Sequence, residues 1–261
     1  MARNVTVHDP ALGPLTDDRL TRDVRVFQRA KGHRFSSDDV ATAYVAHGTR
    51  PGARRVLDLG TGLGSVLLLL GWKLPHAELC GVEAQAMSFE LLTRNVARSG
   101  FAERIRVRHG DLRDRELLAS FGGGFELITG TPPYFPPDAA LDAEDEQRAF
   151  ARIEYRGGVE AYIEAAAPLL APGAALVLCG DARVAARVDA AGRSAGLAIA
   201  ARTDVVARAG QPALFSIWTL DHSSLRCTTG TLTLRGPGGD TTPDAAKLRE
   251  FSGFEPARDP P

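Results

Sequence analysis

The segment VLDLGTGLGS (Val56–Ser65) carries the strongest structural signal in the chain. It begins with a short apolar run typical of a buried strand, and glycines follow at positions 60, 62 and 64. The next residues, SVLLLLGWKL, predict a helix. A glycine-rich turn between a strand and a helix lets the backbone approach a ligand closely. The segment therefore predicts a strand, a ligand-binding turn and a helix in succession.

Strands and helices alternate on both sides of this turn, which is typical of an α/β fold. We predict a Rossmann-like α/β sheet of seven strands, mostly parallel, with helices on both faces. The last two predicted strands lie close together in the sequence, so the final one is expected to be antiparallel. The predicted strands are 55–60, 77–83, 104–111, 125–130, 174–180, 197–206 and 213–220, and the helices between them are 64–74, 84–100, 112–120, 158–170 and 181–196.

The two ends of the chain are less regular. Residues 1–20 look irregular, a strand is expected near Val24 and Val26, and a helix is expected to start at Ser36 or Ser37. We predict an N-terminal extension over residues 1–50, a hairpin and a helix packed on the main domain. The main domain is expected over 51–237. Residues 238–261, rich in proline, glycine and aspartate, are predicted to be a C-terminal tail with a frayed end.

Composition places few limits on function. The chain has 261 residues, of which 44% are hydrophobic and 24% are charged, as in ordinary globular proteins. Its formal net charge of −1 argues against nucleic-acid binding, which normally requires a basic surface. Arginine is nevertheless concentrated in two stretches, 19–34 and 104–115. The default interpretation of such stretches is a solvated face, and contact with a polyanion is the alternative.

Targeting and metal-binding signals are missing from the sequence. The longest apolar run, Ser65–Leu74, is too short to span a bilayer, and no signal peptide opens the chain. The three cysteines are widely spaced, so we expect neither a metal site nor a disulfide framework, and we expect Cys80 and Cys179 to be buried. We therefore expect a cytoplasmic protein with no membrane or metal partner. The oligomeric state cannot be read from the sequence.

Three acidic residues end three successive predicted strands. Asp58 precedes the glycine turn, where a carboxylate repels a pyrophosphate but attracts a cationic amino group. Glu83 can accept from both hydroxyls of a ribose, and Asp111 from the amino group of an adenine. The glycine spacing also differs from the G-x-G-x-x-G fingerprint of dinucleotide sites. An amino-acid group, a ribose and an adenine in this order predict S-adenosylmethionine, and with it the fold of a class I methyltransferase.

The fourth of these strands runs into a rigid loop. In ELITGTPPYF (Glu126–Phe135), two adjacent prolines stop the strand and an aromatic pair follows. This pattern resembles the [N/D/S]-P-P-[Y/F] loop of S-adenosylmethionine-dependent amino-methyltransferases, which act on adenine N6, cytosine N4 or glutamine side chains. In those enzymes the leading side chain and a backbone carbonyl accept the two hydrogens of the acceptor NH₂ group, and the aromatic ring stacks on the base.

Longer segments are similar to one subfamily, the bacterial tRNA adenine-N6 methyltransferases that act beside the anticodon of valine tRNA. These segments include HRFSSDDVATAYVA, TPPYF and LTLRGP, and together they cover most of residues 12–237. The resemblance implies an S-adenosylmethionine-dependent enzyme, with tRNA or another nucleic acid as its partner. It implies that Phe35 and Ser37–Asp38 close over the cofactor. It also implies a catalytic loop of Thr131, Pro132, Pro133 and Tyr134, cofactor contacts from Phe35, Ser37, Asp58, Gly60, Gly62, Gly64, Glu83, Asp111 and Leu112, and substrate contacts from Tyr134, Phe135, Arg148 and Arg152.

Thr131 departs from the family pattern, because it stands where the family has asparagine. It is either a neutral replacement, with backbone carbonyls orienting the amino group, or the mark of a different acceptor, such as a small molecule or a protein glutamine. A cofactor-binding protein with little activity is a third possibility. We expect the acidic segment Asp138–Arg148 to form a mobile flap over the substrate. His33, His47, His76 and His109 share no ligand spacing and are expected to be surface or capping groups.

Overall fold

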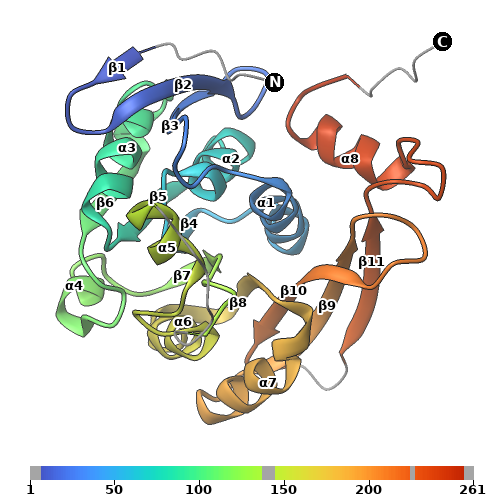
Figure 1. Cartoon of the computed structure of the whole chain (residues 1–261). Coiled ribbons are helices and arrows are strands. Elements are labelled where there is room, and N and C mark those ends of the chain that lie inside the picture. The colour runs from blue at the N-terminus through green and yellow to red at the C-terminus, as the bar shows by residue number, and fades with distance from the viewer. Residues whose placement is uncertain (1–6, 137–144, 224–226, 256–261) are drawn as a thin grey trace.

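An eight-stranded sheet forms the centre of the protein (Figure 1). This computed structural model describes residues 7–136, 145–223 and 227–255, and within them the strand order is β11-β9-β10-β8-β7-β4-β5-β6. Strand β10 is antiparallel to both neighbours, and the other pairs are parallel. The strands are β4 (Arg55–Leu59), β5 (Glu78–Glu83), β6 (Ile105–His109), β7 (Phe125–Gly130), β8 (Leu170–Gly180), β9 (Ala198–Val206), β10 (Ala213–Asp221) and β11 (Thr228–Thr233).

The prediction of a mostly parallel α/β sheet is confirmed, and the predicted number of seven strands is wrong. The additional strand is β11, which pairs with β9 at the edge of the sheet. Its sequence, TTGTLT, contains a single large apolar residue, and four of its six residues are exposed. An edge strand needs little apolar surface, so it leaves a weak signal in the sequence.

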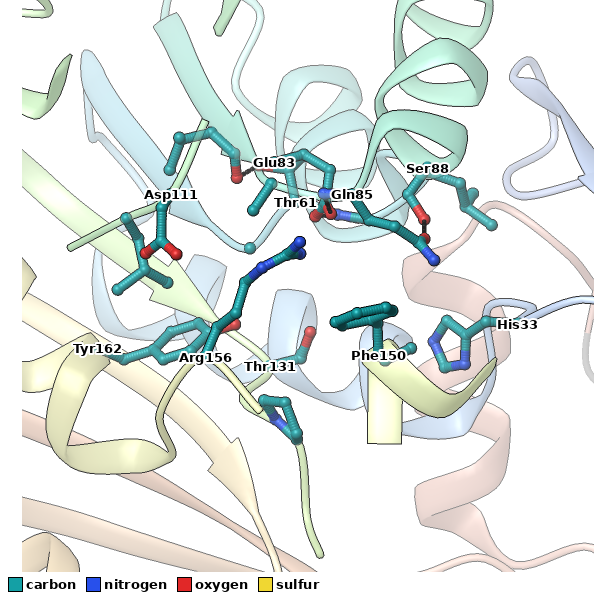
Figure 2. Close-up of a pocket in the computed structure, with 18 of the residues that line it drawn as sticks. His33, Thr61, Glu83, Gln85, Ser88, Asp111, Thr131, Phe150, Arg156 and Tyr162 are labelled. Atoms are coloured by element: carbon teal, nitrogen blue, oxygen red, sulfur yellow. Dashed lines mark hydrogen bonds between the residues drawn. The ribbon is translucent and has the colours of Figure 1, made fainter. Parts of the chain in front are cut away.

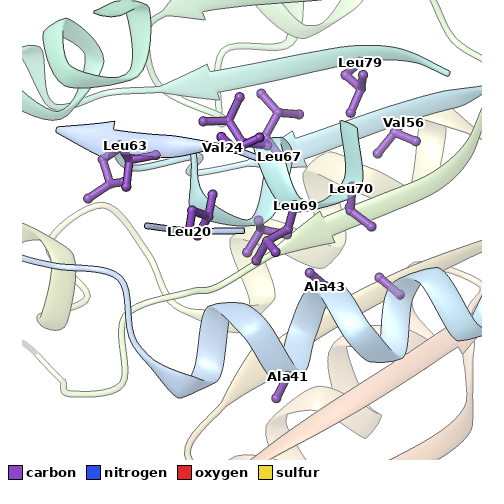
Figure 3. Close-up of a cluster of buried hydrophobic side chains, with 14 of the residues drawn as sticks. Leu20, Val24, Ala41, Ala43, Val56, Leu63, Leu67, Leu69, Leu70 and Leu79 are labelled. Carbon is purple, nitrogen blue, oxygen red and sulfur yellow. The ribbon is translucent and has the colours of Figure 1, made fainter. Parts of the chain in front are cut away.

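Helices cover both faces of the sheet. Helices α1 (Ser37–Thr49), α2 (Ser65–Lys73) and α3 (Ala86–Ala97) contribute to one hydrophobic cluster, and α4 (Arg115–Ala119), α6 (Val159–Ala166) and α7 (Ala185–Ser194) contribute to the other. Helix α2 is buried from Ser65 to Gly71, which explains its uninterrupted apolar sequence (Figure 3). Burying each of its leucines stabilises the fold by about 1.5–3 kcal/mol.

The N-terminal segment is more regular than its sequence suggests. Strands β1 (Val7–Asp9), β2 (Gly13–Arg19) and β3 (Arg25–Arg29) form a three-stranded antiparallel sheet, so the expectation of irregular structure before residue 20 is wrong. Leu20 and Val24, at the turn between β2 and β3, pack in the same cluster as α2 (Figure 3). These contacts join distant parts of the chain, so they cannot be predicted from the local sequence.

The C-terminal segment contains an element that the sequence did not predict. Residues 243–251 form helix α8 (Pro243–Phe251) within the predicted C-terminal tail. The Thr242 hydroxyl caps this helix by accepting a hydrogen bond from the Ala245 amide at 3.1 Å. The buried Phe251 ring meets Tyr44 of α1 edge to face, with ring centroids 5.5 Å apart. How the chain divides into domains stays a prediction.

Candidate active site

A pocket of about 890 Å³, its open mouth included, lies at the carboxyl ends of β4, β5 and β6 (Figure 2). The structure brings most of the predicted cofactor residues to its wall: Phe35, Gly60, Gly62, Glu83, Asp111 and Leu112, together with Thr131 and Pro133 of the predicted catalytic loop.

The glycine turn has the geometry that its sequence predicts. Gly60 and Gly62 have φ angles of +62° and +59°, which L-residues rarely adopt. A Cβ atom at Gly60 would lie 2.2 Å from the hydroxyl of Tyr162, a buried residue of α6 that also lines the pocket. Gly60 therefore also makes room for Tyr162, a site residue that the sequence did not reveal. Gly64 caps α2 and packs toward Leu92, away from the pocket wall.

Glu83 joins the second strand to the glycine turn. Its carboxylate accepts hydrogen bonds from the backbone amides of Gly62 at 2.8 Å and Gln85 at 2.7 Å. Figure 2 places it on the pocket wall beside Thr61 and Gln85. A carboxylate oxygen can accept more than one hydrogen bond, so both oxygens remain able to bind hydroxyl groups.

Asp111 lies at the opposite side of the pocket from Ser88 (Figure 2). The guanidinium of Arg113 holds it through two hydrogen bonds of 2.9 and 2.8 Å. These bonds lower the pKa of Asp111, so it remains an ionised acceptor at neutral pH. Arg113 thus fixes the carboxylate without filling all of its acceptor positions.

Asp58 lies behind the pocket and is not one of the residues that line it. It is 2% exposed, and its carboxyl accepts a hydrogen bond from the Thr129 hydroxyl of β7 at 2.6 Å. Besides Glu83, the acid on the pocket wall near the glycine turn is Asp39, in the first turn of α1. Asp39 accepts from the Ser65 hydroxyl at 2.7 Å and the Ser36 amide at 2.8 Å. No local sequence pattern singles out Asp39, because its place on the wall depends on the packing of distant segments.

The buried acids make the pocket suited to a cation. Burial, together with the charges of Asp39 and Glu83, raises the pKa of Asp58 to about 7. Burial also raises the pKa of Asp39 and that of Glu83. Each of these carboxyl groups is ionised more easily when a positive charge lies nearby. A ligand with an ammonium or sulfonium group is therefore favoured in this pocket.

Replacing Asp58 by asparagine is expected to change how stability depends on pH. The folded protein holds a proton on Asp58 up to about pH 7, whereas the unfolded chain releases it near its ordinary, lower pKa. The contribution of Asp58 to the free energy of unfolding is therefore fully present at low pH. It is lost as the pH rises from the ordinary pKa of an aspartate to about 7. The substituted side chain keeps an acceptor for Thr129 but does not titrate. From about pH 5 to about pH 8 the variant should gain roughly 5 °C in Tm relative to the wild type.

This prediction is tested by thermal unfolding without cofactor across the same pH range. Glu103→Gln, at a side chain that is 73% exposed, is the matched control and should follow the wild type. Parallel Tm curves for the wild type and Asp58→Asn would contradict the raised pKa.

A second hollow adjoins the first on the far side of the Pro-Pro loop. Thr131 borders both hollows, and Figure 2 shows its hydroxyl directed into the first. The second hollow brings together the remaining predicted residues: Ser37, Pro132, Tyr134, Phe135, Arg148 and Arg152. The loop Thr131–Tyr134 therefore lies between the first pocket, which favours a cation, and the second hollow, which contains Arg148 and Arg152.

Helix α5 (Glu146–Arg152), which the sequence did not predict, supplies part of both walls. Its buried Gln147 accepts from the His33 amide at 3.2 Å and donates to Ser88 Oγ at 3.2 Å. His33, which was expected to be a surface or capping group, is half-buried and lines both hollows. Residues 138–144 of the predicted acidic flap lie outside the described residues.

Arg156 is a further residue that the sequence did not single out. Figure 2 shows its side chain extending into the pocket, between Glu83 and Phe150. Its guanidinium carbon lies 4.6 Å from the centroid of the Phe150 ring, and its charge lowers the pKa of both Glu83 and Asp111. The positive charge of Arg156 thus partly offsets the negative charges of Glu83 and Asp111 in the pocket.

The N-terminal arginine-rich stretch is largely neutralised by nearby acids. Arg25 pairs with Asp17, and Arg34 pairs with Asp18. Arg29 reaches Asp145, the N-cap of α5, at 2.7 Å. These pairs support the interpretation of the stretch as a structural, solvated face. By contrast, no ion pair holds Arg148 or Arg152 within the part of the chain that the structure describes, and Arg152 packs over the Phe135 ring at 5.3 Å.

The fold is that of a class I methyltransferase. It is similar to the crystal structure of a predicted O-methyltransferase from Agrobacterium tumefaciens, with a TM-score of 0.62 and 22% identity over 85% of this chain and 99% of that one. It also resembles a type I restriction-modification methyltransferase subunit from Streptococcus thermophilus, with a TM-score of 0.58 and 14% identity over 85% of this chain and 52% of that one. Residues 31–145 match the methyltransferase small domain family.

Curated relatives share part of the chain. It is 37% identical over 123 residues to a tRNA1(Val) (adenine(37)-N6)-methyltransferase of Porphyromonas gingivalis, which is 47% of this chain and 48% of the relative. It is 33% identical over 161 residues to a release factor glutamine methyltransferase of Deinococcus radiodurans, which is 59% of this chain and 55% of the relative. The chain thus spans about half the length of these relatives.

Two further observations concern partners. None of the helices in the described part of the chain is long and apolar enough to cross a membrane. Among residues 7–136, 145–223 and 227–255, no group of three or more histidine, cysteine, aspartate or glutamate side chains is placed to hold a metal ion.

Proposed function

We propose that this protein is an S-adenosylmethionine-dependent N-methyltransferase that acts on the N6 amino group of an adenine in tRNA. One observation carries the proposal: the loop from Thr131 to Tyr134 lies between the acid-lined pocket and the arginine-bearing hollow. The similarity of 123 residues of the chain to a tRNA1(Val) (adenine(37)-N6)-methyltransferase supports the same acceptor.

The residues of the first pocket fit S-adenosylmethionine, which when bound supplies a methyl group on a positively charged sulfur. Glu83 would hold the ribose hydroxyls, and Asp111 would accept from the adenine amino group. Asp39, with Asp58 behind it, would favour the ammonium and sulfonium charges. The glycine turn lets the backbone approach the amino-acid part closely.

The loop at the other side of the pocket would hold the acceptor. The Thr131 hydroxyl and a backbone carbonyl would accept the two hydrogens of the adenine amino group. Tyr134 would stack on the base, and the two prolines keep these groups in fixed positions. Arg148 and Arg152 would contact flanking phosphates from the second hollow. Alignment of the amino group with the methyl group supplies much of the rate in such transfers.

A change of Thr131 to asparagine should keep or raise activity on tRNA. Asparagine offers a carboxamide oxygen that reaches further than the threonine hydroxyl and lies in a plane with the amino group it binds. We expect a rate between that of the wild type and about tenfold above it, in line with one better-made hydrogen bond. Steady-state methyl transfer measures this, with Thr131→Ala as the control that removes the acceptor. A lower rate for Thr131→Asn than for Thr131→Ala would contradict the role given to this side chain.

A different acceptor is the second candidate. The resemblance to a release factor glutamine methyltransferase favours a protein amide, and the net charge of −1 is unusual for a tRNA-binding enzyme. The geometry of the loop suits either acceptor, because a glutamine amide is also a planar NH₂ group.

The decisive test is methyl transfer from labelled S-adenosylmethionine to bulk tRNA from a strain that lacks this gene. The product is digested to nucleosides and identified by mass, and tRNA from the parent strain is the matched control. Labelled N6-methyladenosine in tRNA from the strain that lacks the gene, but not in tRNA from the parent strain, supports the proposal. Cofactor binding without label on tRNA would overturn it, and label on a protein fraction of the same lysate would favour the glutamine alternative.

A further inference from the structure

The Tyr134 side chain is held at both ends. At its backbone, the Tyr134 and Phe135 amides donate to the Arg152 carbonyl at 3.1 and 2.9 Å. At its tip, the Tyr134 hydroxyl donates to Asp38 Oδ2 at 3.1 Å and lies 2.8 Å from Cys179 Sγ. A side chain fixed at both ends has one orientation, and Tyr134 lines the second hollow.

The roles of the three polar groups at the tip follow from their chemistry. The tyrosine has one hydroxyl proton, and the Asp38 carboxylate is the better acceptor for it. The Cys179 thiol is buried in β8, and burial raises its pKa, so it keeps its proton and can donate to the Tyr134 oxygen. The hydroxyl therefore donates to one partner and accepts from the other, which defines its position.

Asp38 is itself fixed by the first turn of α1. Its other oxygen, Oδ1, accepts from the Asp39 amide at 3.1 Å and from the Ser36 hydroxyl. The neighbouring Asp39 faces the first pocket and accepts from Ser65, the first residue of α2. The first turn of α1 thus directs the Asp39 carboxyl group toward the first pocket and the Asp38 carboxyl group toward the Tyr134 hydroxyl.

We infer that Asp38 is a positioning residue that, together with Cys179, sets the plane of the Tyr134 ring for stacking on the acceptor base. The inference rests on the proposed N-methyltransferase function and deepens it. The family resemblance placed Asp38 as a lid over the cofactor, whereas its hydrogen bonds connect it to the acceptor side. Pre-orienting the ring lowers the cost of placing the base for transfer.

A double-mutant cycle tests the connection. Tyr134→Phe keeps the ring and removes the hydroxyl, and Asp38→Ala removes its acceptor. Each is expected to lower kcat/KM for RNA about tenfold, as loss of a hydrogen bond to a charged group does. The double variant should be no worse than either single variant, because Asp38 acts through the hydroxyl. Cofactor affinity should be unchanged in all three, and Asp38→Asn, which keeps an acceptor oxygen, should restore most of the rate.

Glu116→Ala provides a matched control. Glu116 is an exposed acid in the first turn of α4, so this change also removes a favourable charge from a helix N-terminus. It should leave kcat/KM at the wild-type value. Additive losses in the double-mutant cycle, or a weakened cofactor affinity in Asp38→Ala, would overturn the inference in favour of a general effect on α1.

A spectroscopic readout separates this inference from the proposed function. The chain has four tyrosines, so ring ¹³C–¹H signals can be assigned to Tyr134 by comparison with Tyr134→Phe. Asp38→Ala should shift the Tyr134 signals, and Asp38→Asn and Glu116→Ala should leave them near their wild-type positions. Unchanged signals in Asp38→Ala would overturn the inference whatever the activity. A shift in a protein that transfers no methyl group to RNA would support the positioning contact and defeat the RNA acceptor.

Discussion

Replacing Tyr134 by alanine should lower kcat/KM for methyl transfer to tRNA by about a hundredfold. The expected size follows from stacking of an aromatic ring on a base, which contributes ~1–3 kcal/mol. Tyr134 lines the second hollow, and its backbone amide is hydrogen-bonded to the Arg152 carbonyl. The lower kcat/KM should therefore arise from poorer placement of the acceptor base. The first pocket has its own set of residues, and cofactor affinity should change less than twofold, within ~0.4 kcal/mol.

The measurement pairs initial rates on tRNA with calorimetric titration of S-adenosylmethionine. Tyr134→Phe is the matched control, because it keeps the stacking surface and should lose only the smaller contribution of the hydroxyl. Equal rates for the wild type and Tyr134→Ala would remove stacking from the mechanism. A large loss of cofactor affinity in Tyr134→Ala would instead place the ring in the first pocket.

The parts of the fold that the sequence predicts well are those built from local patterns. Six of the seven predicted strands follow the glycine turn, the first five of them in regular alternation with helices, and all seven form strands in the sheet. The turn itself is predictable because positive φ angles favour glycine, as at Gly60 and Gly62. Glu83 and Asp111 are predictable for a related reason: parallel strands bring their carboxyl ends to one edge, so acids that end such strands lie close together.

The parts that the sequence does not predict depend on contacts between distant segments. Asp39 reaches the pocket because α1 packs beside α2, and Tyr162 reaches it because α6 packs behind Gly60. Asp58 has the expected sequence position but turns toward Thr129 of the adjacent strand, with which it is in register. Helix α8 is likewise stabilised by the distant contact of Phe251 with Tyr44.

The charge of the chain illustrates the same limit. An arginine-rich stretch looks basic in the sequence, yet the fold places Asp17 and Asp18 against Arg25 and Arg34. The arginines that remain available for an anionic acceptor come from α5, a helix that sequence periodicity did not identify. The net charge of the chain is therefore a weak guide to whether the second hollow can bind a phosphate backbone.

Glu83→Ala is expected to raise the Kd for S-adenosylmethionine by at least about a hundredfold. Under the proposed function, the change would remove two hydrogen bonds to ribose hydroxyls, and bonds to a charged group contribute about 1.5–3 kcal/mol each. It also leaves the Gly62 and Gln85 amides without the carboxylate that they contact at 2.8 and 2.7 Å. The glycine turn then loses a support on the pocket wall, which adds to the loss of affinity.

Calorimetric titration of cofactor against the folded variant tests this prediction, and thermal unfolding verifies that the variant is folded. Glu90→Ala, which removes an exposed glutamate from the neighbouring helix α3, is the matched control and should bind as the wild type does. Because burial raises the pKa of Glu83, wild-type affinity should also fall toward acidic pH as this carboxylate takes up a proton. In Glu83→Ala that contribution to the pH dependence should be absent. A variant that binds cofactor normally, with an unchanged pH profile, would place the ribose elsewhere in the pocket.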